Sequence, residues 1–353
     1  MRTRATVKFL ESLYIKAFIN IVVDKKGTTL YVETYKKEKL HASYEEHFNV
    51  FGVDEKIIEY IHNFTKETPF FYIAYLDNST QQGALPTCLK SEMSRYYDLS
   101  ESEYKCVDKK WTYYTSKTDL YELEKIYEKI GLDFIFSPFA LVSNFFKDKL
   151  EVHFAGYILL QEDLITLSIF ENATLLYAES INVESYVPEE ILEEPAIEDE
   201  EDLDIVEEIE EGIDLDDISA IDELDSLDDF GDIADLDSLD DIDNFSQEED
   251  IEEEFNEEVA AITQGEGAAS EDEDLVSTED YQRFTLIQES INRYYHDDRY
   301  DSKFLETLYI ADGVGVSSML KQYFEEEMFL SVYVRSIDIA QELSQLALEE
   351  VIS

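Results

Sequence analysis

Apolar runs alternate with short polar breaks along most of the chain, and this pattern predicts an ordered series of strands and helices. Residues 18–40 alternate apolar and polar positions around a DKKG turn, which is typical of a β-hairpin. Residues 157–181 contain three apolar runs, with a turn at 171–173, and predict a three-stranded meander. Strand, glycine turn, helix and strand follow one another over 307–334, as in an α/β unit.

The remaining periodic segments fill the chain between and around these units. Strands are expected at 69–76, 110–116 and a short stretch within 133–146, and helices at 54–64, 119–131, the end of 133–146, 279–297 and 337–351. Residues 7–18 place apolar side chains on one helical stripe and predict an amphipathic helix over residues 1–18. That helix either packs on its own domain or, with Arg2, Arg4 and Lys8, docks on a membrane surface or a partner.

The formal net charge of -57 comes mainly from one segment. Residues 189–280 hold 43 Asp or Glu and no Lys or Arg, while the other 261 residues hold 41 acids and 27 bases. The unit LDSLDD occurs at 224–229 and again at 236–241. A segment this charged buries too little apolar surface to offset its ordering entropy, so we expect residues 188–278 to be a disordered acidic loop. It is either a tether that docks on a basic partner surface or a solvating spacer.

Charge and cysteine content narrow the function classes further. Nucleic-acid binding needs clustered Lys and Arg, and the chain has no such cluster. The five histidines do not stand at metal-ligand spacing, so we expect no metal site. Cys88 and Cys106 favour two free thiols in a reducing cytoplasm, although a disulfide between them is not excluded. No apolar run reaches the length of a membrane span, and no cleavable signal peptide is expected, so the predicted location is cytoplasmic.

The order of elements resembles the actin-like ATPase fold. The resemblance is greatest to the PilM-type protein of type IV pilus machines and to the cytoplasmic domain of GspL-type type II secretion proteins. Four stretches carry it: VVDKKGTTLYVETYKKEKL, DFIFSPFALVSNFF, the meander, and the block from Arg283 to Val334. The resemblance implies a two-lobed α/β, RNase H-like fold with the acidic loop inserted in the second lobe. The first lobe would span 19–150, and the second 151–187 and 279–353.

The resemblance also implies a nucleotide site between the lobes, built from three turns. Asp24, Gly27 and Thr28 stand in the first turn, and Gln161 and Glu162 in the second. The third turn, whose glycines would admit the adenosine, contains Asp312, Gly313 and Gly315. Glycine allows backbone N–H groups to approach phosphates, and an acidic side chain holds a metal or water. The second turn has no glycine, and its acids would repel a phosphate, so we expect a degenerate site without catalytic residues.

Three functions follow from these features. The first is a non-enzymatic cytoplasmic scaffold of a pilus or secretion assembly, peripheral on the inner membrane. It would receive a short peptide from a membrane-anchored platform protein and contact a motor ATPase. The second is an ATPase or nucleotide switch with variant loops that binds ATP and Mg²⁺. The third is an acidic protein that binds basic partners as a nucleic-acid mimic.

Overall fold

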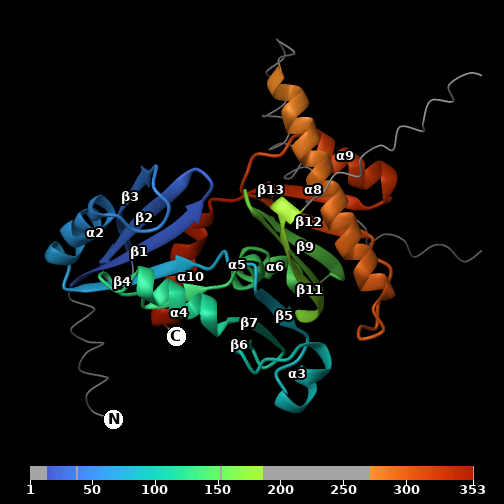
Figure 1. The fold of residues 1–353 in the computed structure, drawn as a ribbon, viewed down its shortest axis with the longest axis horizontal. Helices are drawn as coiled ribbons and strands as arrows, with labels where there is room; N and C mark the ends of the chain where they lie inside the picture. The colour runs from blue at the N-terminus through green and yellow to red at the C-terminus, as the bar shows by residue number, and fades with distance from the viewer. Residues whose placement is uncertain (1–13, 37–38, 152, 186–270, 353) are drawn as a thin grey trace, which may run out of the picture. The chain divides into compact units, whose positions relative to one another are not determined.

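The computed structural model of the chain describes residues 14–36, 39–151, 153–185 and 271–352. Its first sheet contains β1 (Ile15–Asp24), β2 (Gly27–Lys36), β3 (Lys39–Phe48), β4 (Phe70–Leu76) and β8 (Phe134–Phe136). The strand order is β3-β2-β1-β4-β8. The three strands β1, β2 and β3 form an antiparallel meander, and β4 and β8 add in parallel beyond β1 (Figure 1).

A second sheet repeats this arrangement. It contains β9 (Ala155–Leu160), β10 (Leu164–Glu171), β11 (Thr174–Asn182), β12 (Thr307–Asp312) and β13 (Ser331–Ser336), in the order β11-β10-β9-β12-β13. Again a three-strand antiparallel meander comes first, and two parallel strands follow beside its first strand. Two sheets with the same order and directions define the actin-like, two-lobed α/β fold, as the resemblance implied.

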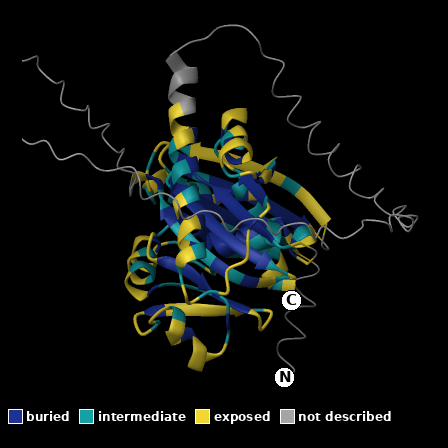
Figure 2. Ribbon diagram, turned by 90° about the vertical axis from the view of Figure 1, so that its right-hand side faces the viewer, coloured by how far each residue is buried: buried dark blue, intermediate teal, exposed yellow. Residues whose placement is uncertain are grey.

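Helices cover the faces of both sheets. In the first lobe α2 (Glu55–Glu67) covers an aliphatic face that includes Ile19, Ile21 and Val32. In the second lobe α8 (Glu271–His296) and α9 (Ser318–Glu327) cover an aliphatic face that includes Ile158 and Leu167. The buried residues accordingly lie in the central strands, and the outward helix faces are exposed (Figure 2). A single-turn 3₁₀ helix, Val183–Ser185, follows β11.

A small third sheet, in the order β5-β7-β6, is inserted between β4 and the end of the first lobe. Its strands are β5 (Gln82–Leu85), β6 (Ser102–Val107) and β7 (Trp111–Ser116), with α3 (Lys90–Tyr96) between β5 and β6. The sequence predicted only β7. A disulfide joins Cys88 to Cys106 across this sheet, so the expectation of two free thiols is wrong. Helices α4 (Lys117–Ile126), α5 (Pro138–Phe145) and α6 (Lys147–Leu150) complete the first lobe.

The C-terminal helix α10 (Ile339–Ile352) packs on the sheet of the first lobe, although the sequence assigned it to the second. Ala340, Leu343 and Ala347 of this helix share a buried cluster with β1 and β2. The buried carboxylate of Glu33 on β2 accepts a hydrogen bond from Ser344 Oγ at 2.6 Å, and two more from tyrosines of its own strand. The last helix therefore holds the second lobe against the first.

Two other predictions need correction. The amphipathic helix expected over residues 1–18 is wrong where the structure describes it, because Ile15–Asp24 is a strand that pairs on both sides. Residues 1–13 lie outside the described residues. The acidic loop expected at 188–278 is shorter at its C-terminal end, since α8 already begins at Glu271. Residues 188–270 also lie outside the described residues.

Candidate functional site

The three turns expected to hold a nucleotide follow β1, β9 and β12. Register explains why the last two are neighbours, because Asp312 at the end of β12 pairs with Leu160 at the end of β9. The first turn reaches the second through ion pairs between side chains of the two lobes. The structure therefore brings the predicted site residues to one place between the lobes, apart from Thr28, which is buried within the first lobe.

The first turn is closed by its own side chains. The carboxylate of Asp24 accepts hydrogen bonds from the backbone N–H groups of Lys26 and Gly27, at 2.8 and 3.1 Å. Gly27 has φ +138°, and a Cβ there would stand 2.1 Å from the carbonyl oxygen of Phe48. Thr28 is fully buried and donates its hydroxyl to the carbonyls of Val50 and Gly52. The residues of this turn thus have structural partners within the lobe, and Thr28 does not reach the cleft.

The second turn connects the lobes by a hydrogen bond. Gln161 is buried, and its Nε2 donates to Oδ1 of Asn78 at 3.0 Å. Asn78 in turn donates from Nδ2 to the carbonyl oxygen of Val23 at 2.7 Å. The backbone N–H of Gln161 is also occupied, since it donates to the carbonyl of Leu164. The side chain that would stand beside a phosphate instead links β9 to the end of β1.

The third turn is capped by Asp312. Its carboxylate accepts hydrogen bonds from the backbone N–H groups of Val314, Gly315 and Val316, at 2.8 to 3.0 Å. Gly313 is needed for packing, because a Cβ there would stand 2.8 Å from the carbonyl oxygen of Leu160. Gly315 has φ +82° with open space around it, so its conformation alone explains the glycine. The backbone N–H groups of this turn, where the resemblance implies the adenosine, are already bonded to Asp312.

Two lysines of the first turn pair with acids across the cleft. Lys25 Nζ lies 3.0 Å from a carboxylate oxygen of Asp163 and 3.5 Å from one of Glu184. Lys26 Nζ lies 2.5 Å from a carboxylate oxygen of Glu162. The hydrogen bonds to Asp163 and Glu162 raise the pKa of Lys25 and Lys26 respectively. Sequence reasoning missed these lysines, although the opposite charges of DKKG and QED were a readable signal.

An open cleft of about 630 Å³ lies beside the ion pairs, and its lining is strongly acidic. Among the described residues that line it, Lys25 is the only lysine or arginine, whereas the carboxylates are Asp24, Asp77, Asp119, Glu122, Asp163 and Glu184. Burial raises the pKa of Asp119, and the charges of Asp77 and Glu122 raise it further. Within the described residues, no group of three or more His, Cys, Asp or Glu is arranged to hold a metal ion. Turns whose backbone N–H groups are already hydrogen-bonded, beside an acidic lining, do not fit a nucleoside triphosphate.

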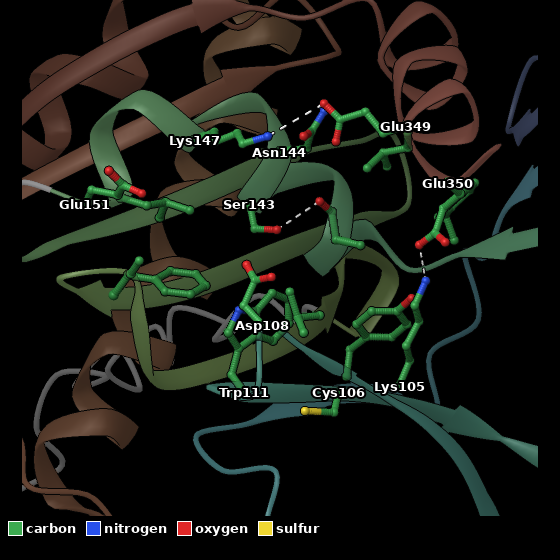
Figure 3. A pocket seen from close by; sticks show the side chains of 18 residues that line it. Lys105, Cys106, Asp108, Trp111, Ser143, Asn144, Lys147, Glu151, Glu349 and Glu350 are labelled. Atoms are coloured by element: carbon green, nitrogen blue, oxygen red, sulfur yellow. Dashed lines mark hydrogen bonds and ion pairs between the residues drawn. The ribbon is translucent and has the colours of Figure 1, made fainter. Parts of the chain in front are cut away.

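A second hollow, of about 440 Å³, lies between the third sheet, α5 and α10 (Figure 3). Its apolar lining includes Trp111, Phe136 and Phe170. On its rim Lys105 pairs with Glu350, and Lys147 lies 3.7 Å from Glu349. Both pairs join the first lobe to the end of α10, so the two lysines of this hollow are already matched by acids.

The comparisons with known families divide the chain between two profiles. The chain belongs to the family described as a domain of unknown function, DUF8341, whose profile matches residues 157–352. A second profile, also described as a domain of unknown function, DUF8569, matches residues 14–143. The interval between them contains α6, where the chain passes from the first sheet to the second. No curated protein sequence matches the chain.

Solved structures of low sequence identity resemble the chain along most of its length. One is a Bacteroides thetaiotaomicron protein with actin-like ATPase fold and unknown function, at 11% identity and TM-score 0.45, covering 96% of this chain and 98% of that one. Another is the PilM-PilN type IV pilus biogenesis complex, at 9% identity and TM-score 0.43, covering 92% and 89%. A third is the ethanolamine utilization protein EutJ from Carboxydothermus hydrogenoformans, at 9% and 0.33, covering 93% and 86%. The fold assignment rests on the strand order of the two sheets.

Proposed function

We propose that this protein is a non-enzymatic scaffold of a type IV pilus or type II secretion-like assembly at an inner membrane. The observation that carries the non-enzymatic part is the pairing of Lys25 and Lys26 with Asp163 and Glu162. These pairs occupy the space between the first and second turns, where a member of this fold with a working site binds phosphates. The pilus and secretion context comes from the order of elements in the sequence.

The chemistry of the turns supports a site that has lost its nucleotide. Phosphate binding at such turns depends on free backbone N–H groups and on available positive charge. Here Asp24 and Asp312 accept the N–H groups of their own turns, and both lysines are paired with acids. A phosphate would have to displace those bonds and enter a cleft lined by six carboxylates. An ATPase function would require all of these interactions to rearrange when ATP binds.

In this proposal the scaffold takes a short peptide from a membrane-anchored platform protein and contacts a motor ATPase. The acidic segment is a tether for a basic partner surface. Among the described residues, no helix is long and apolar enough to cross a membrane. A peripheral position on the cytoplasmic face is part of the proposal. The Cys88–Cys106 disulfide is the feature that fits a reducing cytoplasm least, since disulfides are rare there.

Calorimetric titration of the purified full chain with ATP and Mg²⁺ tests the non-enzymatic part. We expect no binding heat at millimolar ATP from a sample shown to be folded and free of nucleotide. The matched variant is Lys25→Ala with Lys26→Ala, which opens the ion pairs and should still bind no ATP because the N–H groups remain capped. Micromolar binding by the wild-type chain, with release of ADP over time, would overturn the proposal.

A further inference from the structure

The cleft between the lobes carries negative charge that the described part of the chain does not neutralise. Lys25 is committed to Asp163 and Glu184. Four other carboxylates line the same cleft and have no ion pair with any described residue: Asp24, Asp77, Asp119 and Glu122. Like charges gathered in a concave wall repel one another and concentrate a negative potential in the cleft. A ligand that brings positive charge would relieve this repulsion.

The same cleft has an exposed apolar wall. Phe51 and Ile126 line it, and they are 70% and 56% exposed. Tyr75 and Leu123 continue the apolar lining beneath them. Large apolar side chains exposed together at a concave surface mark a contact site for a partner. The cleft therefore offers an acidic wall and an apolar wall to one ligand.

The hollow beside α10 has a smaller acidic excess than the cleft, because two lysines and four acids line it. There Lys105 and Lys147 face Glu350 and Glu349 and form ion pairs with them. Its floor is apolar and largely buried, with Trp111 only 3% exposed. Within the described residues, that hollow keeps two carboxylates without an ion pair, Asp108 and Glu151, whereas the cleft keeps four and adds two large apolar side chains that are exposed.

We propose that the cleft binds a protein segment that carries Lys or Arg next to an apolar side chain. The cationic groups pair with Asp119 and Glu122, and the apolar side chain packs on Phe51 and Ile126. This inference rests on the proposed function, because segments of membrane proteins next to the cytoplasmic face are rich in Lys and Arg. A small polyamine would satisfy the carboxylates but would leave the apolar wall exposed, so the segment is the better fit.

Fluorescence anisotropy with a short labelled peptide of alternating lysine and leucine tests the proposal on the full chain. The test variant is Asp119→Asn with Glu122→Gln. The control is Glu59→Gln with Glu128→Gln, which changes the charge equally at two exposed positions of the same lobe outside the cleft. We expect the test variant to bind about tenfold more weakly and the control to bind like wild type, because only the test variant loses the two carboxylates that pair with the peptide's lysines. Phe51→Ala should also weaken binding, by about fivefold.

Equal weakening by the test and control variants would overturn the proposal, because it would show binding through the bulk charge of the chain. The proposal would also be overturned if spermine displaced the peptide and the Phe51→Ala variant bound the peptide like wild type. That result would indicate a site for small polycations. A circular dichroism spectrum and a melting temperature equal to those of wild type show that a variant is folded. The ATP titration separates the two proposals: ATP binding overturns the scaffold, while absence of both ATP and peptide binding overturns only this inference.

Discussion

The same four residues, VDKK, form two hairpin turns in this protein, at 23–26 and at 107–110. In the first turn both lysines pair with acids of the other lobe. In the second turn Lys109 and Lys110 are exposed and pair with no other described residue. Identical local sequence thus gives an inter-lobe contact in one place and a solvated tip in the other. The surrounding structure, rather than the turn itself, decides what the lysines do.

The two turns also differ in backbone. Asp24 pairs with Gly27 in the first hairpin, so two residues connect its strands. Val107 pairs with Trp111 in the second, so three residues connect them. The first turn requires glycine at its end, at φ +138°, whereas the second places Asp108 and Lys109 at φ 48° and 61°. The first turn is held by ion pairs to the other lobe, and the second by the disulfide at Cys106, next to Val107.

The largest change in stability should come from removing the disulfide that holds the second turn. The bridge closes a loop between residues 18 positions apart, and loop-closure entropy assigns such a bridge about 3 kcal/mol of stability. Cys88→Ser with Cys106→Ser should therefore lower the free energy of unfolding by about that amount in urea titration. The first turn should be unaffected, so a variant that also loses the contact between Lys25 and Asp163 would contradict the separation of the two anchors.

The next largest effect comes from replacing the residue at a positive-φ position in each turn. The change in stability should have opposite signs in the two turns. Gly27→Ala places a Cβ against the carbonyl oxygen of Phe48 at positive φ, and should cost about 2 kcal/mol. Lys109→Gly relieves a left-handed backbone and should be neutral or stabilising by under about 1 kcal/mol. Thermal unfolding of both variants at one pH provides the measurement. Equal destabilisation by the two variants would show that the two turns do not differ in their need for glycine.

The sequence predicted most strands and helices because their apolar positions repeat with a clear period. Segment 284–294 is an example, with its buried residues on the expected helix face. Strand β3 was not predicted. Nearly all of its residues are exposed, so its sequence lacks the apolar and polar alternation of a half-buried strand. Two strands of the third sheet also escaped prediction, because β5 has only four residues and β6 is mostly exposed. The disulfide could not be assigned, since two cysteines alone do not reveal their separation in space.

The sequence identified the three turns, but not the hydrogen bonds and ion pairs that their residues form. Asp24 and Asp312 stand in the turns as expected, yet each caps backbone N–H groups of its own turn. Thr28 was expected near phosphate and is buried. These outcomes depend on side-chain rotamers and on the approach of the two lobes, which residue type and spacing do not specify. Opposite charges in the first and second turns were visible, but only the fold showed that they meet.

The smallest effect, and the most direct test of the comparison, comes from reversing charge in each turn. Lys25→Glu with Lys26→Glu replaces attraction to Asp163 and Glu162 by repulsion and should destabilise by about 1 kcal/mol, because exposed pairs are screened by solvent. Lys109→Glu with Lys110→Glu makes the same charge change and should shift stability by under about 0.5 kcal/mol. High salt should reduce the difference between the two variants.

The pH dependence has a defined sign. Hydrogen bonds to acids raise the pKa of Lys25 and Lys26 above the ordinary value of 10.5. Their contribution to stability is therefore complete below pH 10.5 and is lost as pH rises through the higher folded-state values. Urea titration at neutral pH and in that alkaline range should show the gap between wild type and the Lys25→Glu, Lys26→Glu variant narrowing. Equal destabilisation by both charge-reversed turns would mean that the cleft pairs do not hold the lobes.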